Sequence, residues 1–331
     1  MAGPGEKMEP WTTTRTLRFS AVALVGLAGC ASVAGEAPLP YGAQARSLSG
    51  EVLYPPPIAP SDLARREGEL ARARAELEAK PRDLEAQLWV GRRLGYLGRF
   101  REAVDAFTLA ALDHPEDPRP WRFRGHRYIT LRRFDDAQRD LEEAARRIEG
   151  RPDEVEPSGA PNARGIELDT LNQNVHYHLG LARYLRGDLD GALAAWRDCR
   201  RFSNNPDALC SVTHWLYTVL RRLGRDAEAR AVLEPIRADL DVVEYHAYHR
   251  LVLAYKGELD PTSLLASTSP SGGGGVDFAT MGYGIANMRL CDGERVRALE
   301  TLRRVEGCEA WHAFGRIAAE AELHRLGAVG R

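Results

Sequence analysis

Histidine pairs are the first residues in this sequence that could hold a metal, because imidazole is a common zinc ligand. His176 and His178 are two residues apart, so on a helix their side chains point to different sides. His246 and His249 are three apart and can share one helix face, with Glu244 nearby. A pair without a third ligand is more typical of packing or surface positions, so we predict no metal and no other cofactor.

Four consecutive glycines, Gly272–Gly275, raise the question of a phosphate-binding loop. A P-loop ends in Gly-Lys-Ser or Gly-Lys-Thr on a helix that follows a strand, and neither feature is present in the sequence here. The Gly-x-Ser-x-Gly elbow of serine hydrolases and the His-Glu-x-x-His motif of zinc peptidases are also absent from the sequence. We therefore predict a flexible Gly-rich linker over 266–276 and no catalytic residue. An enzyme of unrecognised type stays an alternative.

An apolar segment lies near the N-terminus. It runs from Phe19 to Gly29, about 11 residues, whereas a bilayer-spanning helix needs roughly 20. Arg15 and Arg18 precede it with no nearby acid, which is typical of the start of a secretory signal peptide. We predict a cleaved signal peptide over residues 1–29.

The signal segment ends in Leu27-Ala28-Gly29-Cys30, an aliphatic residue, two small residues and a cysteine. This order resembles the lipobox of bacterial lipoproteins. The resemblance implies cleavage after Gly29 and acylation of Cys30, for example by palmitate. Two or more acyl chains, at ~0.8 kcal/mol per buried CH₂, would anchor the chain durably. Ala31 rather than aspartate follows, which by family habit favours the outer membrane. An ordinary signal peptide with an accidental cysteine is the alternative.

The composition limits the class of partner. Of the 331 residues, about 300 would remain after cleavage, enough for one large or two modest domains. The counts of Lys+Arg, 45, and Asp+Glu, 47, nearly balance. Nothing in this balance favours a nucleic acid as partner.

An internal repeat predicts the elements that position these residues. The segment LGRFREAVDAFTLAA (97–111) aligns with LRRFDDAQRDLEEAA (131–145). Residues 34 apart match as follows: Phe100 and Phe134, Ala103 and Ala137, Gly91 and Gly125, and Pro81 and Pro115. Thirty-four residues is the period of the tetratricopeptide repeat (TPR), which the chain resembles.

The residue types fit the packing of a TPR, in which two antiparallel helices cross closely. In the family's frame the small residues occupy the eighth and twentieth positions: Gly91, Gly125 and Gly180, then Ala103, Ala137 and Ala192. Bulky residues beside them include Phe107, Leu141 and Trp196. We predict an all-α fold, a right-handed TPR α-solenoid of antiparallel helix pairs with a C-terminal capping helix.

The predicted organisation follows from this period and from the linker-like segments. It consists of the signal peptide at 1–29, a flexible tether at 30–60 after the lipidated cysteine, a TPR array at 61–265, the Gly-rich linker at 266–276, and a final TPR-like pair with the capping helix at 277–331. Within the array we place repeats at about 84–117, 118–151, 173–206 and 210–243, and a degenerate half at 244–265. The helix predicted over 61–80 is a leading half-repeat, or alternatively a coiled coil. The polar segment 151–165 is expected to be a mobile loop.

The helix-pair model bears on the remaining cysteines. Cys199 would lie near the end of one second helix and Cys210 near the start of the next first helix. These ends are neighbours in a TPR stack, so a disulfide is feasible. Cys291 and Cys308 would be separated by about 12 helical residues, roughly 18 Å, and should not bond.

In a TPR array the first helices line a concave surface, onto which positions two, five, nine, twelve and thirteen project. These positions hold Arg92, Tyr96, Arg122, His126, Ile129, Asn174, Tyr177, Leu181, Tyr184, His214, Thr218 and Arg221. Aromatic and arginine side chains are types that anchor interfaces. We predict that this surface binds an extended, acidic or C-terminal segment of a partner protein. The alternative is that several of these side chains are solvated or pack against the tether.

The order of these features resembles the NlpI-type outer-membrane lipoproteins: a lipobox, TPRs, a less regular middle (214–217) and a separated final repeat (283–305). Those proteins are adaptors that present cell-wall hydrolases to a periplasmic tail-specific protease, and they dimerise. The resemblance implies a non-catalytic, lipid-anchored adaptor that faces the periplasm and forms a homodimer. An assembly factor, like the TPR lipoproteins of β-barrel insertion or the type IV pilus pilotins, is the alternative.

Overall fold

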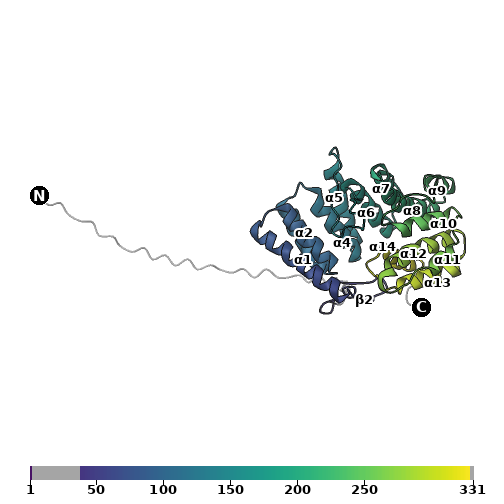
Figure 1. Ribbon diagram of the computed structural model, residues 1–331, viewed down its shortest axis with the longest axis horizontal. Coiled ribbons are helices and arrows are strands. Elements are labelled where there is room, and N and C mark those ends of the chain that lie inside the picture. The colour runs from purple at the N-terminus through teal and green to yellow at the C-terminus, as the bar shows by residue number, and fades with distance from the viewer. Residues whose placement is uncertain (2–37, 329–331) are drawn as a thin grey trace, which may run out of the picture. The chain divides into compact units, whose positions relative to one another are not determined.

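Helices make up most of the computed structural model, which describes Met1 and residues 38–328 (Figure 1). Cys30 and the predicted signal peptide lie outside the described residues, so the lipobox and its acylation stay predictions. Within the described ranges no helix is both long and apolar enough to cross a bilayer.

The helices follow one another in pairs. In chain order the elements are β1 (Ala45–Arg46), β2 (Val52–Leu53), α1 (Pro60–Ala79), α2 (Leu84–Tyr96), α3 (Phe100–Asp113), α4 (Pro118–Thr130), α5 (Phe134–Ile148), α6 (Leu171–Arg186), α7 (Leu189–Phe202), α8 (Pro206–Arg222), α9 (Asp226–Leu233), α10 (His246–Tyr255), α11 (Pro261–Ala266), η1 (Gly272–Gly274), α12 (Gly275–Cys291), α13 (Arg295–Glu306) and α14 (Phe314–Arg325). Helix α2 packs on α3, α4 on α5, α6 on α7, α8 on α9 and α12 on α13, and the first three pairs stack in succession. The predicted all-α, TPR-type array of helix pairs with a terminal helix is confirmed.

Two flanking segments complete the array. Helix α1 packs on α2 and buries Leu70. The glycines expected in a flexible linker instead form η1 and the first residue of α12, and the Gly272 N–H donates to the Glu309 carboxylate at 3.0 Å. Regular structure therefore begins within the segment predicted as a linker.

Local chemistry explains where the helices begin and end. The Asp83 carboxylate accepts a hydrogen bond from the Ala86 N–H, and the Asn205 amide oxygen accepts one from Ala208, so α2 and α8 start on capping side chains. Helix α6 ends at Gly187, whose φ of 88° is a left-handed conformation that glycine adopts without strain.

Glycines at the eighth repeat position set the distance between paired helices. A Cβ atom added to Gly91 would lie 2.4 Å from the Phe107 ring, and one added to Gly180 would lie 2.4 Å from the Trp196 ring. Such separations are far inside van der Waals contact. The eighth-position glycine therefore contacts the bulky residue at the twenty-fourth position of the same repeat, Phe107, Leu141 or Trp196. Because each residue requires the other, both recur with the 34-residue period.

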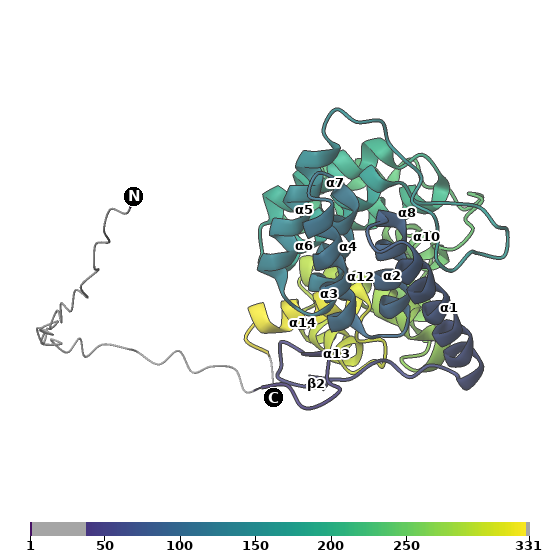
Figure 2. The same cartoon turned by 90° about the vertical axis from the view of Figure 1, so that its left-hand side faces the viewer.

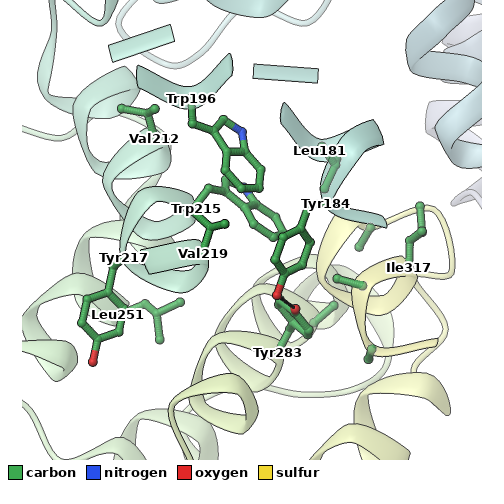
Figure 3. Close-up of a cluster of buried hydrophobic side chains, with 14 of the residues drawn as sticks. Leu181, Tyr184, Trp196, Val212, Trp215, Tyr217, Val219, Leu251, Tyr283 and Ile317 are labelled. Atoms are coloured by element: carbon green, nitrogen blue, oxygen red, sulfur yellow. Dashed lines mark hydrogen bonds between the residues drawn. The ribbon is translucent and has the colours of Figure 1, made fainter. Parts of the chain in front are cut away.

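The largest buried cluster joins the third and fourth pairs to the C-terminal helices (Figure 3). Trp196 stacks on Trp215 with ring centroids 5.2 Å apart, and Trp215 contacts Tyr184 edge-on at 5.8 Å. The Tyr184 hydroxyl lies 2.5 Å from that of Tyr283 in α12. Helices α10 and α12 pack on α8, and α14 packs on α6. The C-terminal helices thus fold back onto α6 and α8, the first helices of the third and fourth pairs.

Residues 38–60 differ from the flexible tether predicted over 30–60. Strands β1 and β2 pair antiparallel, with Ala45 opposite Leu53. Both side chains are buried in a cluster with Phe100 of α3 and Trp311, which precedes α14. Figure 2 labels β2 at the lower edge of the helical array. The tether prediction is wrong for this part because the hairpin has its own apolar contacts with distant elements.

A buried network of charges holds three distant segments together. Glu320 of α14, whose side chain is fully buried, pairs with Arg132 at 2.5 Å and with Arg316 at 3.2 Å. Arg316 also pairs with Glu51 of the hairpin at 2.5 Å. Arg132 has a φ of 61° and is the one non-glycine residue with positive φ among the described residues. Its left-handed turn therefore comes with an ion pair to the C-terminal helix.

Candidate peptide-binding site

The predicted groove residues separate into two groups. One group is buried inside the chain and consists of Ile129, Tyr177, Leu181, Tyr184, His214 and Thr218. The other group lies around one pocket and consists of Arg92, Tyr96, Arg122, His126 and, at its edge, Asn174. Arg221 lies apart from both and pairs with Asp226 and Asp292.

The first group does not line an open surface, so that part of the prediction is wrong. The Tyr177 hydroxyl lies 3.1 Å from that of Tyr248, and His214 Nδ1 lies 2.9 Å from the Tyr255 hydroxyl, both partners being in α10. Tyr184 is covered by α12 in the same way. Helix α10, predicted as a degenerate half-repeat, and α12, predicted as part of the separate final pair, occupy this face of α6 and α8.

The second group lies against a segment that we call the strap, residues 149–170, which connects α5 to α6. A pocket of about 170 Å³ lies between the strap and helices α2 and α4. Gly91, Phe107 and Phe123 provide its apolar lining, and Arg92 and Arg122 its charges. Residues 151–165 of the strap were predicted as a mobile loop; in the structure residues 156–159 form one wall of this pocket.

A carboxylate anchors the strap to the array. Glu156 pairs with Arg122 at 2.7 Å, and their side chains are 10% and 6% exposed. The Asn174 amide donates to the same carboxylate oxygen at 3.1 Å. Burial raises the pKa of the Glu156 carboxyl, and the Arg122 charge opposes that shift. Arg122 Nε and Glu156 Oε2 have no hydrogen-bond partner, so the ion pair is monodentate instead of bidentate.

Two backbone carbonyl groups of the strap accept hydrogen bonds from neighbouring arginines of α2. Arg92 donates to the Pro157 carbonyl, and Arg93 donates to the Gly159 carbonyl at 2.9 Å. A Cβ atom on Gly159 would lie 2.1 Å from the Tyr96 hydroxyl, so the strap backbone packs directly on that ring. Carboxylate, carbonyl and ring contacts together hold three strap residues, Glu156, Pro157 and Gly159.

The pocket is rich in positive charge. Burial, together with the charge of Arg122, lowers the pKa of Arg127 to about 10. Burial also holds the pKa of His126 well below its ordinary value, with Arg127 adding to the shift. A neutral His126 can accept from Arg127, whose Nη2 lies 2.6 Å from His126 Nε2. The guanidinium groups of these arginines donate well to carboxylate and carbonyl oxygens, so the pocket is suited to binding such groups.

The other candidate residues for chemistry occupy packing positions. His249 Nε2 bonds the Arg237 carbonyl at 2.8 Å. His178 packs on His126 with ring centroids 4.3 Å apart, whereas His176 stacks on Phe202, so the first histidine pair does face two sides. Among the described residues no group of histidine, cysteine and acidic side chains is arranged to hold a metal ion.

The disulfide considered feasible between Cys199 and Cys210 is not formed. Both thiols are free and buried, and burial raises the pKa of each to about 12. Cys199 Sγ donates to the Gln173 carbonyl at 3.4 Å. Each cysteine serves as a small apolar residue of the helix interface. Cys291 and Cys308 are also free.

Sequence reasoning missed Arg93, Arg127, Glu156 and Gly159 among the residues of this site. Arg93 and Arg127 do not occupy groove positions of the repeat, and the other two lie in a segment without periodicity. The available signal was the acid-Pro-Ser-Gly order of 156–159, which follows two repeats whose predicted surface carries Arg92 and Arg122.

No protein-family model and no curated protein matches the chain. Solved structures that it resembles include YrrB, described as a TPR protein with an unusual peptide-binding site, at 14% identity and a TM-score of 0.41 over 77% of this chain and 97% of that one. The Naa15/Naa10 complex bound to HypK-THB matches at 14% identity and a TM-score of 0.34, over 78% of this chain and 38% of that one. The P58(IPK) TPR domain matches at 14% and 0.23, over 78% and 83%. At this level of likeness, the ligands of those proteins do not carry over to this chain.

Proposed function

We propose that this chain is a non-catalytic adaptor of the bacterial cell envelope that binds an acidic, extended segment of a partner protein beside Arg92, Tyr96 and Arg122. The observation that carries the proposal is the chain's own strap. The Glu156 carboxylate pairs with Arg122, and the Pro157 and Gly159 carbonyl groups accept hydrogen bonds from Arg92 and Arg93. A partner segment with the same groups could use the same donors.

The chemistry of these contacts defines what the site would select. Carbonyl groups are present in every peptide, so bonds from Arg92 and Arg93 would hold a backbone without selecting a sequence. The carboxylate that reaches Arg122 would set the register, because a buried guanidinium needs a negative partner. The site would therefore favour an acid within an otherwise small, extended segment.

The location of the adaptor is part of the proposal. The lipobox supports acylation of Cys30 and attachment to the outer membrane, facing the periplasm. By resemblance to the NlpI-type lipoproteins, the partners would be cell-wall hydrolases and a tail-specific protease, and the chain would form a homodimer.

Site-specific photocrosslinking in the native host tests the binding surface. A photoreactive phenylalanine in place of Tyr96 should crosslink a discrete partner, identified by mass spectrometry. The same residue in place of Arg139, which is exposed on α5, should not. Adding Arg92→Glu should weaken the Tyr96 crosslink about tenfold, because it removes a charge-assisted donor. Equal adducts from both positions would contradict the proposed surface.

Attachment of the chain to the membrane by a lipid on Cys30 is tested separately. Cys30→Ser should move the chain from the membrane pellet to the soluble fraction and abolish metabolic labelling with a palmitate analogue. A wild-type chain that is neither labelled nor sedimented with membranes would contradict the anchor and leave the binding surface untouched.

A further inference from the structure

We infer that the strap is a built-in competitor: residues 156–159 occupy the partner site when no partner is bound, and an acidic partner segment displaces them. This inference rests on the proposed function and adds its regulation. It requires that the strap be held weakly enough to leave, that it overlap the partner's contacts, and that the array stay folded without it.

Weak attachment follows from what the strap buries. Of its larger apolar side chains, Val155 and Ile166 are 60% and 41% exposed and Leu168 is half-buried, so they contribute little to holding it down. The contacts with the array described above are made by polar side chains, Arg92, Arg93 and Arg122 among them. Segments with few buried apolar contacts open at low free-energy cost.

The strap also fits its site incompletely. A cavity of about 170 Å³ remains beneath it, next to Phe107 and Phe123. Atoms that line an unfilled space forfeit van der Waals contacts. The single-pronged pairing of Glu156 with Arg122 leaves one buried donor and one buried acceptor without partners. A partner that fills the cavity and pairs both prongs would bind better than the resident segment.

The array does not depend on the strap for its helix packing. Helices α4 and α5 pair directly, as do α6 and α7, and α5 packs on α6. The strap has hydrogen bonds within itself, such as Glu156 N–H to the Asp169 carbonyl at 2.9 Å, and others to the array, such as Asn205 to the Leu168 carbonyl at 2.7 Å. Because the helix pairs contact one another directly, the strap can open between Ile148 and Leu171 without parting them.

The test is a binding competition with a defined probe. The probe is a fluorescein-labelled peptide with the sequence of residues 153–160, DEVEPSGA, blocked at both ends, and its binding to the full chain in detergent is followed by anisotropy. Apparent affinity scales with the open fraction of the site. Glu156→Gln removes the anchor, and Gly159→Val places side-chain atoms against Tyr96, so each should lower the Kd by about tenfold relative to wild type.

A matched control is available two residues away. Glu154→Gln makes the same change in charge at an exposed strap residue and should leave the Kd at the wild-type value. The double variant Arg122→Gln/Glu156→Gln should have a Kd about tenfold or more above that of Glu156→Gln alone. Such a rise would show that the probe binds at the pocket. Amide exchange should show faster exchange over 154–171 in Glu156→Gln, with α2 and α4 unchanged as evidence of folding.

The outcomes separate the inference from the function it rests on. Tighter binding by both released variants, with Glu154→Gln unchanged, supports the competitor. One common Kd for wild type, Glu154→Gln and Glu156→Gln overturns the competitor and leaves the binding site standing. Absence of binding to every chain, the released variants included, overturns the site and therefore both proposals.

Discussion

A glycine that touches a bulky side chain of the neighbouring helix explains much of the spacing in this sequence. Gly180→Ala would place a methyl group 2.4 Å from the Trp196 ring, which is fully buried and cannot move aside freely. We expect the free energy of unfolding to fall by about 1–3 kcal/mol, measured by urea denaturation.

The chain provides a matched control for that substitution. Gly68 is also within a helix, α1, but a Cβ there would meet no atom closer than 3.8 Å. Gly68→Ala should raise stability by about 0.5–1 kcal/mol, because alanine loses less backbone freedom than glycine on folding. A similar loss of stability at both positions would show that helix propensity, and not the contact with Trp196, governs Gly180.

Buried histidines should make stability depend on pH. Burial, reinforced by Arg127, Arg132 and Arg66, lowers the pKa of His312 to about 4. This value lies below the ordinary one near 6.5, so the contribution of His312 is fully present above pH 6.5 and is lost as the pH falls toward 4. The loss over that window is on the order of 2–3 kcal/mol.

The test compares the wild type with His312→Gln by urea denaturation between pH 7 and pH 4. Carboxyl groups with a raised pKa, such as Glu156, act in the opposite sense, and the comparison cancels them. The variant should lose less stability than the wild type as the pH falls, whereas His324→Gln on the exposed end of α14 should not differ. Parallel pH profiles for wild type and His312→Gln would refute the prediction.

At the scale of elements, the turn between α4 and α5 differs from its counterparts. The equivalent turns carry a left-handed glycine at Gly98, Gly187, Gly224 and Gly293, but here Arg132 takes that conformation. Its guanidinium reaches Glu320 and the Trp311 carbonyl. The turn accepts a strained backbone and gains a contact between the second pair and the C-terminal helix.

Two substitutions separate these effects. Arg132→Ala loses the buried ion pair and keeps the strained backbone, so stability should fall by about 3–5 kcal/mol. Arg132→Gly loses the same pair but adopts the turn freely, so it should be about 1 kcal/mol more stable than Arg132→Ala. Equal unfolding free energies of the two variants would show that the left-handed turn costs nothing here.

Periodicity made some elements predictable and was silent on others. The helix pairs follow from residues 34 apart, because glycine and its bulky partner must recur together. The hairpin has strands of two residues, too short for any pattern. The strap is anchored by Glu156 and Gly159, two single residues in a segment without repeats. At the site, Arg92, Tyr96, Arg122 and His126 were predicted to share a surface, and they line one pocket.

At the scale of the whole molecule, the return of the C-terminal helices was not predictable from the repeat. A repeat pattern specifies contacts between neighbouring pairs only. The contacts of Tyr283 with Tyr184 and of Phe314 with Tyr177 join elements that are not neighbours in the order of repeats. The predicted groove residues Tyr177, Tyr184 and His214 are covered by α10 and α12 for this reason.

These long-range contacts should change how the chain unfolds. Open solenoids lose repeats from their ends, since each repeat contacts only its neighbours. Here α14 packs on α6, and the hairpin packs on Trp311. We expect one cooperative transition in urea, with coincident midpoints for far-ultraviolet circular dichroism and tryptophan fluorescence.

Trp311→Ala removes a side chain that the hairpin and Phe100 share, at a cost of about 3–5 kcal/mol. In this variant the two midpoints should separate as the ends become independent. Separate midpoints already in the wild type would mean that the long-range contacts do not couple the two ends.

The placement of the hairpin has a mechanical consequence. A pulling force that enters the chain at residue 38 meets the ion pair of Glu51 with Arg316 and the Trp311 indole, which donates to the Tyr54 carbonyl at 2.7 Å, before it reaches α1. The force is thereby transmitted to Trp311 and Arg316 near the C-terminus and does not first pull α1 away from α2. A force on the N-terminal side would first strain the contacts between the hairpin and the C-terminal segment, while the pocket between α2 and α4 keeps its structure.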